Sequence, residues 1–70
     1  MNIVKLKQKM LEHMEGDSFI KELIRVLDIS EPTAIKRLNE GNFTTEEIRK
    51  MKAAYNLTAE ELDEIFYREC

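Results

Sequence analysis

Two closely spaced helix-start signals in the second half of the chain constrain its fold more than any other feature. Thr44-Thr45-Glu46-Glu47 and Thr58-Ala59-Glu60-Glu61 are both capping boxes. In a capping box a threonine hydroxyl and a glutamate carboxylate each accept a hydrogen bond from a backbone N–H at the helix start. An apolar residue precedes each box and another follows it, at the positions of a hydrophobic staple. Because the second signal follows so soon after the first, this part of the chain is predicted to form two short helices.

The first half of the chain has the apolar periodicity of helices. A first helix is predicted over about residues 2–14, ended near Gly16. Asp17 or Ser18 can cap a second helix, which ends near Asp28. The apolar residues of these two helices are Ile3, Leu6, Met10, Met14, Phe19, Ile20, Leu23, Ile24 and Leu27.

A third helix is predicted from Ser30, its N-cap, to Gly41, which ends it. Pro32 falls in its first turn, where a missing N–H costs nothing. Only Ala34 and Leu38 form an apolar i, i+4 pair within it. This helix therefore buries little and turns most of its surface toward something polar.

These patterns predict an all-α fold, a compact bundle of five short helices in a single domain over residues 1–70. With two glycines and one proline, the chain is poor in the turn residues of an all-β fold. No apolar run is long enough for a membrane span, and Lys5, Lys7 and Lys9 interrupt the one candidate signal-peptide core. The single cysteine, Cys70, excludes an intramolecular disulfide and a zinc site of several thiolates, and is predicted to be a free thiol.

The charge balance is a warning against assuming a nucleic-acid partner, because the net charge is −3. Basic and acidic side chains balance over residues 1–41, so the acid excess belongs to residues 42–70. Any basic surface is therefore expected in the first part of the chain.

No grouping of residues predicts catalysis. The chain has no phosphate-binding glycine loop, nucleophile elbow or metal-ligand spacing. The carboxylates of residues 60–64 lie at a helix start, where they suit the helix dipole. His13 has no second histidine or cysteine at ligand spacing and is predicted to lie on the surface. We expect no enzyme activity, no cofactor, no metal and no small-molecule substrate.

Residues 23–30 end one helix and cap the next across a turn of about three residues, the connection that a helix-turn-helix uses. The exposed arc of the following helix suits the major groove of DNA, where a recognition helix meets base edges. The apolar contact between the two helices would comprise Leu23, Leu27, Ile29, Ala34 and Leu38. The exposed arc would hold Pro32, Thr33, Lys36, Asn39 and Glu40, flanked by Ile35 and Arg37.

In the order of these residues the chain resembles helix-turn-helix regulators of the Cro and phage-repressor (xenobiotic-response-element) type, including small five-helix versions from prophages of low-GC Gram-positive bacteria. The resemblance implies a lambda-repressor-like DNA-binding domain, acting in the cytoplasm of a bacterial host. It spans nearly the whole chain and rests on Leu23, Leu27, Ile29-Ser30, Thr33-Ala34, Lys36-Arg37-Leu38-Asn39, Gly41, Phe43-Thr44, Glu47-Ile48, Asn56-Leu57-Thr58, Leu62, Ile65 and Phe66.

Four residues depart from the family pattern. Ile24 replaces an alanine where helices approach closely, and Asp28 replaces the turn glycine. Aspartate enters the left-handed region more readily than most residues, so it is tolerable there. Ile20 stands where a glutamine commonly contacts phosphate, and Pro32 where a small polar base-reading residue is usual.

The third helix holds most of the candidate DNA contacts, and several have a plainer alternative. Lys36 and Arg37 either contact DNA or form a solvated face. Asn39 either bonds adenine or phosphate, or is a polar residue near the helix end. Ile35 either meets a thymine methyl or completes the core. The full candidate set is Lys21, Arg25, Ser30, Glu31, Pro32, Thr33, Ile35, Lys36, Arg37, Asn39 and Asn42.

Three further candidates are charged. Glu31 either accepts a hydrogen bond from cytosine or suits the helix dipole. Lys21 and Arg25 share one face of the second helix and either flank phosphates or point into solvent. At the other end of the chain, Phe66 and Tyr67 are either terminal core packing or the candidate dimer contacts. Two adjacent aromatic residues cannot easily face one core, so Phe66 is expected to fill the core and Tyr67 to point elsewhere.

We therefore predict a sequence-specific DNA-binding transcriptional regulator that binds a pseudo-palindromic double-stranded operator as a homodimer. The alternative is a protein-interaction module, such as an anti-repressor, that kept the helix-turn-helix frame but lost its affinity for DNA. The net charge, Ile20 and Pro32 support this alternative.

Overall fold

A computed structural model describes residues 1–68, in which short loops join helices and no strand is present. The predicted all-α fold of five short helices is confirmed, with the fifth continuing into a wider turn. Cys70 lies outside the described residues. None of the described helices has the length and apolar character needed to cross a membrane. The elements are α1 (Ile3–His13), α2 (Phe19–Leu27), α3 (Glu31–Glu40), α4 (Thr45–Tyr55), α5 (Ala59–Leu62) and η1 (Asp63–Tyr67).

Side-chain caps begin the helices where the sequence predicts them. Ser18, rather than Asp17, caps α2, and Ser30 caps α3. Thr44 and Thr58 open α4 and α5 with both hydrogen bonds of a capping box in place. The cap of α1 is Asn2, whose side-chain oxygen accepts from the backbone N–H of Lys5 at 3.1 Å.

Three helices end at residues in the left-handed conformation, which closes the last turn. These are Asp28 after α2 (φ 56°), Gly41 after α3 (φ 67°) and Asn56 after α4 (φ 52°). Aspartate and asparagine visit this region more readily than other residues with a side chain. Asp28 therefore permits a sharp turn between α2 and α3.

We expect Asp28→Gly to be at least as stable as the wild type, and Asp28→Ala to lose about 1 kcal/mol of unfolding free energy, because a Cβ in the left-handed region is strained. Urea denaturation of both variants measures the difference. Asp17→Ala, an exposed change in the α1–α2 loop, is the control. Equal stability of Asp28→Gly and Asp28→Ala would show that the backbone at Asp28 carries no strain.

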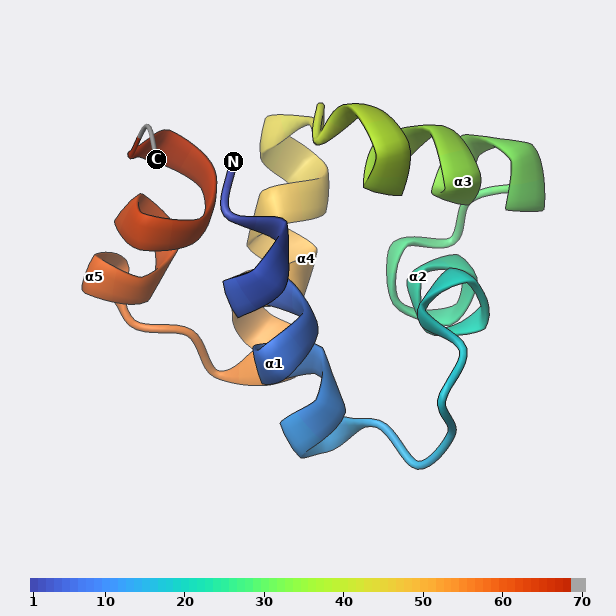
Figure 1. The fold of residues 1–70 in the computed structure, drawn as a ribbon, viewed down its shortest axis with the longest axis horizontal. Helices are drawn as coiled ribbons and strands as arrows, with labels where there is room; N and C mark the ends of the chain where they lie inside the picture. The colour runs from blue at the N-terminus through green and yellow to red at the C-terminus, as the bar shows by residue number, and fades with distance from the viewer. Residues whose placement is uncertain (69–70) are drawn as a thin grey trace.

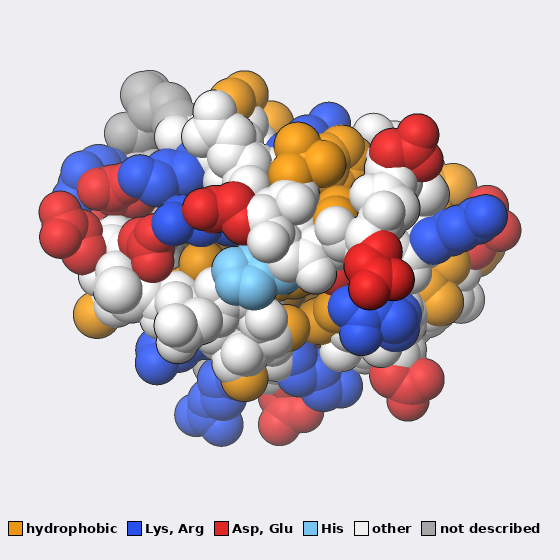
Figure 2. All heavy atoms as spheres, turned by 90° about the horizontal axis from the view of Figure 1, so that it is seen from below, with side chains coloured by type: hydrophobic (Ala, Val, Ile, Leu, Met, Phe, Trp, Pro, Cys, Tyr) orange, Lys and Arg blue, Asp and Glu red, His pale blue; other side chains and the backbone are white. Residues whose placement is uncertain are grey.

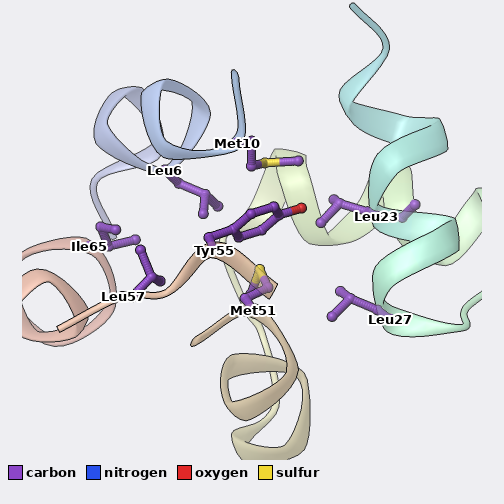
Figure 3. Close-up of a cluster of buried hydrophobic side chains, with 9 residues drawn as sticks. Leu6, Met10, Leu23, Leu27, Met51, Tyr55, Leu57 and Ile65 are labelled. Carbon is purple, nitrogen blue, oxygen red and sulfur yellow. The ribbon is translucent and has the colours of Figure 1, made fainter. Parts of the chain in front are cut away.

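The core lies between α1, α2, α4 and η1, and Tyr55 of α4 is at its centre (Figure 3). Its ring contacts side chains from several elements, and its hydroxyl points toward α2. The most apolar faces of α1 and α2 are buried here, as their periodicity predicts. The fully buried members with large side chains are Leu6, Met10, Leu23, Leu27, Met51, Tyr55 and Ile65.

Figure 1 shows how this core positions α3. In that view α2 is seen nearly end-on and α3 lies lengthwise across it, so the two helices cross. α2 packs against both α3 and α4. The turn between α2 and α3 consists of Asp28, Ile29 and Ser30. As a result, α3 lies at the edge of the bundle with one side open.

The last described turn is wider than an α-helix. In η1 the backbone N–H of Arg68 donates to the carbonyl of Asp63 at 2.7 Å, an i to i+5 bond. The backbone N–H of Asn2 donates to the carbonyl of Ile65 at 2.7 Å, so the start of the chain is tied to η1. Such local π-type turns are uncommon and were not predicted from the sequence.

Ion pairs join α1 to the C-terminal helices. Lys5 pairs with Glu64, and Lys9 pairs with Glu61. The Lys9 ammonium, together with the Thr58 N–H at the capping box, lowers the pKa of Glu61 to about 2. The same contact raises the pKa of Lys9. These acids therefore neutralise two of the lysines in the first part of the chain.

Acid is expected to weaken this contact. The pKa of Glu61 is about 2 in the folded protein and 4.5 ordinarily. Its stabilising contribution is therefore complete above about pH 4.5 and is lost as the pH falls toward 2. Glu61→Gln keeps a cap acceptor but cannot ionise. The melting temperatures of wild type and Glu61→Gln should differ at pH 6 and converge near pH 2; a constant difference across this range would contradict the assignment.

Candidate nucleic-acid interface

α3 uses little of its surface for the core. Ala34 is its one fully buried residue, and Leu38 is partly buried beside it. On the opposite side Pro32, Lys36 and Asn39 are exposed. Ile35 is 42% exposed, so of its two predicted roles the core role does not hold. The outward face of α3 comprises Glu31, Pro32, Ile35, Lys36, Asn39 and Glu40.

Arg37 lies on the other flank of α3 and is held against α4. Its Nε donates to Glu47 Oε1 at 2.8 Å, and its side chain is only 20% exposed. Glu47 is itself buried and also accepts from the backbone N–H of Thr44 at 2.9 Å. One carboxylate thus closes the capping box of α4 and fixes the position of α3. The Arg37 guanidinium is therefore engaged within the protein, unlike Lys36 on the outward face.

The start of α3 is held by its own hydroxyls. Ser30 Oγ accepts from the backbone N–H of Thr33 at 3.4 Å and lies 2.9 Å from Thr33 Oγ1. Glu31 and Pro32 are exposed in the first turn, and Asn42 is exposed in the loop after the helix. Capped at Ser30, closed at Gly41 and anchored through Arg37, α3 is constrained along its whole length.

A buried carboxylate ties α2 to α4 behind this surface. Glu22 Oε2 accepts from the Tyr55 hydroxyl at 3.0 Å. Arg25 donates to both oxygens of Glu22, at 2.9 and 3.0 Å from Nη2. Burial, and then the nearby charge of Glu22, raise the pKa of Tyr55, so its hydroxyl stays a donor. Paired in this way, the buried charge of Glu22 is tolerated.

The two candidate phosphate contacts on α2 remain accessible. Lys21 is exposed, and the Arg25 side chain is 69% exposed despite its bonds to Glu22. A guanidinium has five N–H donors, so Arg25 can hold Glu22 and still offer donors outward. Lys36 is the exposed basic side chain on the outward face of α3, and within residues 1–68 it forms no ion pair. Glu31 and Glu40 on α3 offset part of this positive charge.

Figure 2 shows the face of the molecule that lies away from α3, seen from below. Acidic and basic side chains are interspersed there, without a large area of one sign. An open depression of about 450 Å³ lies beside the α1–α2 loop, lined by His13, Met14, Glu15, Gly16, Glu22 and Arg25. His13 is exposed, as predicted, and the centroid of its ring lies 5.7 Å from the centroid of the Tyr55 ring. Within residues 1–68 no three metal-binding side chains are grouped.

The candidate dimer residues differ in exposure. Phe66 is partly buried and packs edge-on against Phe43, with ring centroids 5.9 Å apart. Tyr67 is 61% exposed and stands edge-on to Phe66 at 6.5 Å. Packing of Phe66 therefore orients Tyr67 outward, away from the core.

Sequence reasoning missed the two buried glutamates. Glu22 and Glu47 are both 7% exposed and are the only buried charged residues among those described. Nothing near Glu22 in the sequence marked it for burial, because the hydroxyl that bonds it comes from Tyr55 on another helix. For Glu47 the signal was the capping box, whose carboxylate is committed to the helix start.

No family model, curated protein or solved structure matches this chain.

Proposed function

We propose that the protein is a sequence-specific DNA-binding transcriptional regulator in which α2, the turn 28–30 and α3 form a helix-turn-helix. The observation that carries this proposal is the outward face of α3. A helix is held rigidly at the edge of the bundle, and only one side of it serves the core. A recognition helix needs this arrangement, because its exposed side chains must reach base edges from a fixed frame.

The residues around α3 divide into two roles. Ile35, Lys36 and Asn39 are directed to base edges, since they lie on the outward face. Lys21 and Arg25 on α2 are directed to the phosphates that flank the groove. The contacts at the two ends of α3 come from Ser30, Glu31, Pro32, Thr33 and Asn42. Occupation of promoter DNA would repress transcription without a cofactor.

Selection from a pool of randomised duplexes tests this proposal. Purified protein is mixed with the pool, bound duplexes are recovered, and the enriched sequence is measured against a scrambled one in a binding titration. We expect a short motif to be enriched and to bind at least tenfold more tightly than the scrambled duplex, since specific binding commonly exceeds non-specific binding by about a thousandfold or more. No enrichment over several rounds would contradict the proposal.

We further propose that the protein binds its operator as a homodimer through Tyr67. One copy of α3 offers few base-reading side chains, so two half-sites about one helical turn apart are needed for useful specificity. Tyr67→Ala is expected to keep the melting temperature and to weaken binding to the two-half-site duplex. Sedimentation with and without DNA should give two protomers per duplex. A single protomer at saturation, or unchanged dimerisation of Tyr67→Ala, would contradict this interface.

A second candidate is favoured by the charge of α3. Glu31 and Glu40 flank Lys36, and Arg37 is committed to Glu47, so the surface around α3 is close to neutral. A protein-interaction module would suit such a surface as well. If the protein is such a module, no duplex should be enriched in the selection, and its affinity for DNA should not change with salt concentration. Contacts to phosphates would instead make the affinity fall as the salt concentration rises.

A further inference from the structure

The outward face of α3 combines one exposed apolar side chain with one exposed amide. Ile35 and Asn39 are four residues apart on the helix, so their Cβ atoms are neighbours, about 5–6 Å apart. Ile35 is 42% exposed, whereas Ala34 and Leu38 are the apolar side chains of α3 that pack inward. Among residues 1–68 no side chain or backbone group hydrogen-bonds the Asn39 amide. Both side chains therefore have unused binding capacity on the same side of the helix.

The two side chains match one kind of base pair. In the major groove an A·T pair presents the N7 acceptor and N6 donor of adenine beside the methyl group of thymine. An amide offers a donor and an acceptor to that adenine edge, and an aliphatic side chain packs against that methyl. A G·C pair has no methyl, and its guanine edge has two acceptors in place of an acceptor and a donor. The neighbouring Lys36 suits guanine acceptors or phosphate instead.

We infer that Ile35 and Asn39 together read A·T pairs in each operator half-site, Ile35 through a thymine methyl and Asn39 through the N7 and N6 groups of adenine. This inference rests on the proposed function and adds the base composition that the outward face of α3 selects. It gives the exposed Ile35 side chain a role in recognising bases, since Ile35 is not part of the core.

Atom-level changes in the enriched duplex test the inference. Uracil in place of thymine removes only the methyl group, and 7-deazaadenine in place of adenine removes only the N7 acceptor. At one thymine, uracil should weaken wild-type binding about fourfold, the value of one buried methyl group. At one adenine, 7-deazaadenine should weaken it about five- to tenfold. Ile35→Ala should be insensitive to the first change, and Asn39→Ala to the second.

Matched controls lie on α1, away from α3. Leu11→Ala removes an exposed aliphatic side chain and Gln8→Ala an exposed amide, and both should respond to the base changes as wild type does. The inference is overturned if the enriched duplex is bound specifically but no thymine or adenine change depends on Ile35 or Asn39. In that case the proposed function stands, and other residues read the bases. If no duplex is enriched at all, the proposed function fails, and this inference fails with it.

Discussion

Replacing Leu23 by alanine is expected to lower the free energy of unfolding by about 2–5 kcal/mol. Leu23 is fully buried on α2 and faces the cluster around Tyr55 (Figure 3). Removing its branched end leaves a cavity that the surrounding helices fill only in part. A domain of this size has a total stability of about 4–10 kcal/mol. The substitution should therefore remove a large share of it, and urea denaturation measures the loss.

Leu11→Ala is the matched control, because Leu11 is 54% exposed on α1. A surface substitution of this kind changes stability by about 0.5 kcal/mol or less. If Leu23→Ala and Leu11→Ala lowered the free energy of unfolding equally, the placement of Leu23 in the core would be wrong. Because α2 carries α3, partial unfolding of Leu23→Ala should also reduce DNA binding in proportion to the unfolded fraction.

The second large effect is expected on DNA binding. Lys36→Ala and Asn39→Ala should each weaken binding to the enriched duplex by about 1–3 kcal/mol, which is about five- to 150-fold. Both side chains are exposed and lie on the outward face of α3, so neither variant should change the melting temperature by much. Fluorescence anisotropy with labelled duplex measures the affinity.

Lys52→Ala is the control for the loss of one exposed lysine, because Lys52 lies on α4. It should lose less affinity than Lys36→Ala, and the same amount on enriched and scrambled duplexes. If both α3 variants bind the enriched duplex as wild type does, α3 is not the helix that reads the sequence.

Local features were predictable because they depend on neighbours in the sequence. A hydroxyl or carboxylate three residues from a free N–H can cap it whatever the rest of the chain does. Ser30, Thr44 and Thr58 therefore mark helix starts correctly, and Gly41 marks an end. Apolar spacing likewise identified the buried faces of α1 and α2 and the thin apolar side of α3.

Pairings between helices were not predictable, because they depend on which faces meet. Arg37 could be assigned to solvent or DNA from its neighbours alone, and its bond to Glu47 follows only from the packing of α3 on α4. Glu22 gave no sign of burial by itself, since the Tyr55 hydroxyl that compensates it comes from another helix. Ile35 was ambiguous for the same reason, and its exposure limits it to a surface role.

Mapping the enriched duplex onto the protein shows whether α3 contacts DNA bases. Titration of the duplex into uniformly ¹⁵N-labelled protein, followed by amide chemical shifts, reports which residues change their surroundings. We expect the largest shifts in residues 30–42 and around Lys21 and Arg25, with small shifts in α1. Large shifts confined to α1 or to the C-terminal helices, with α3 unchanged, would contradict it.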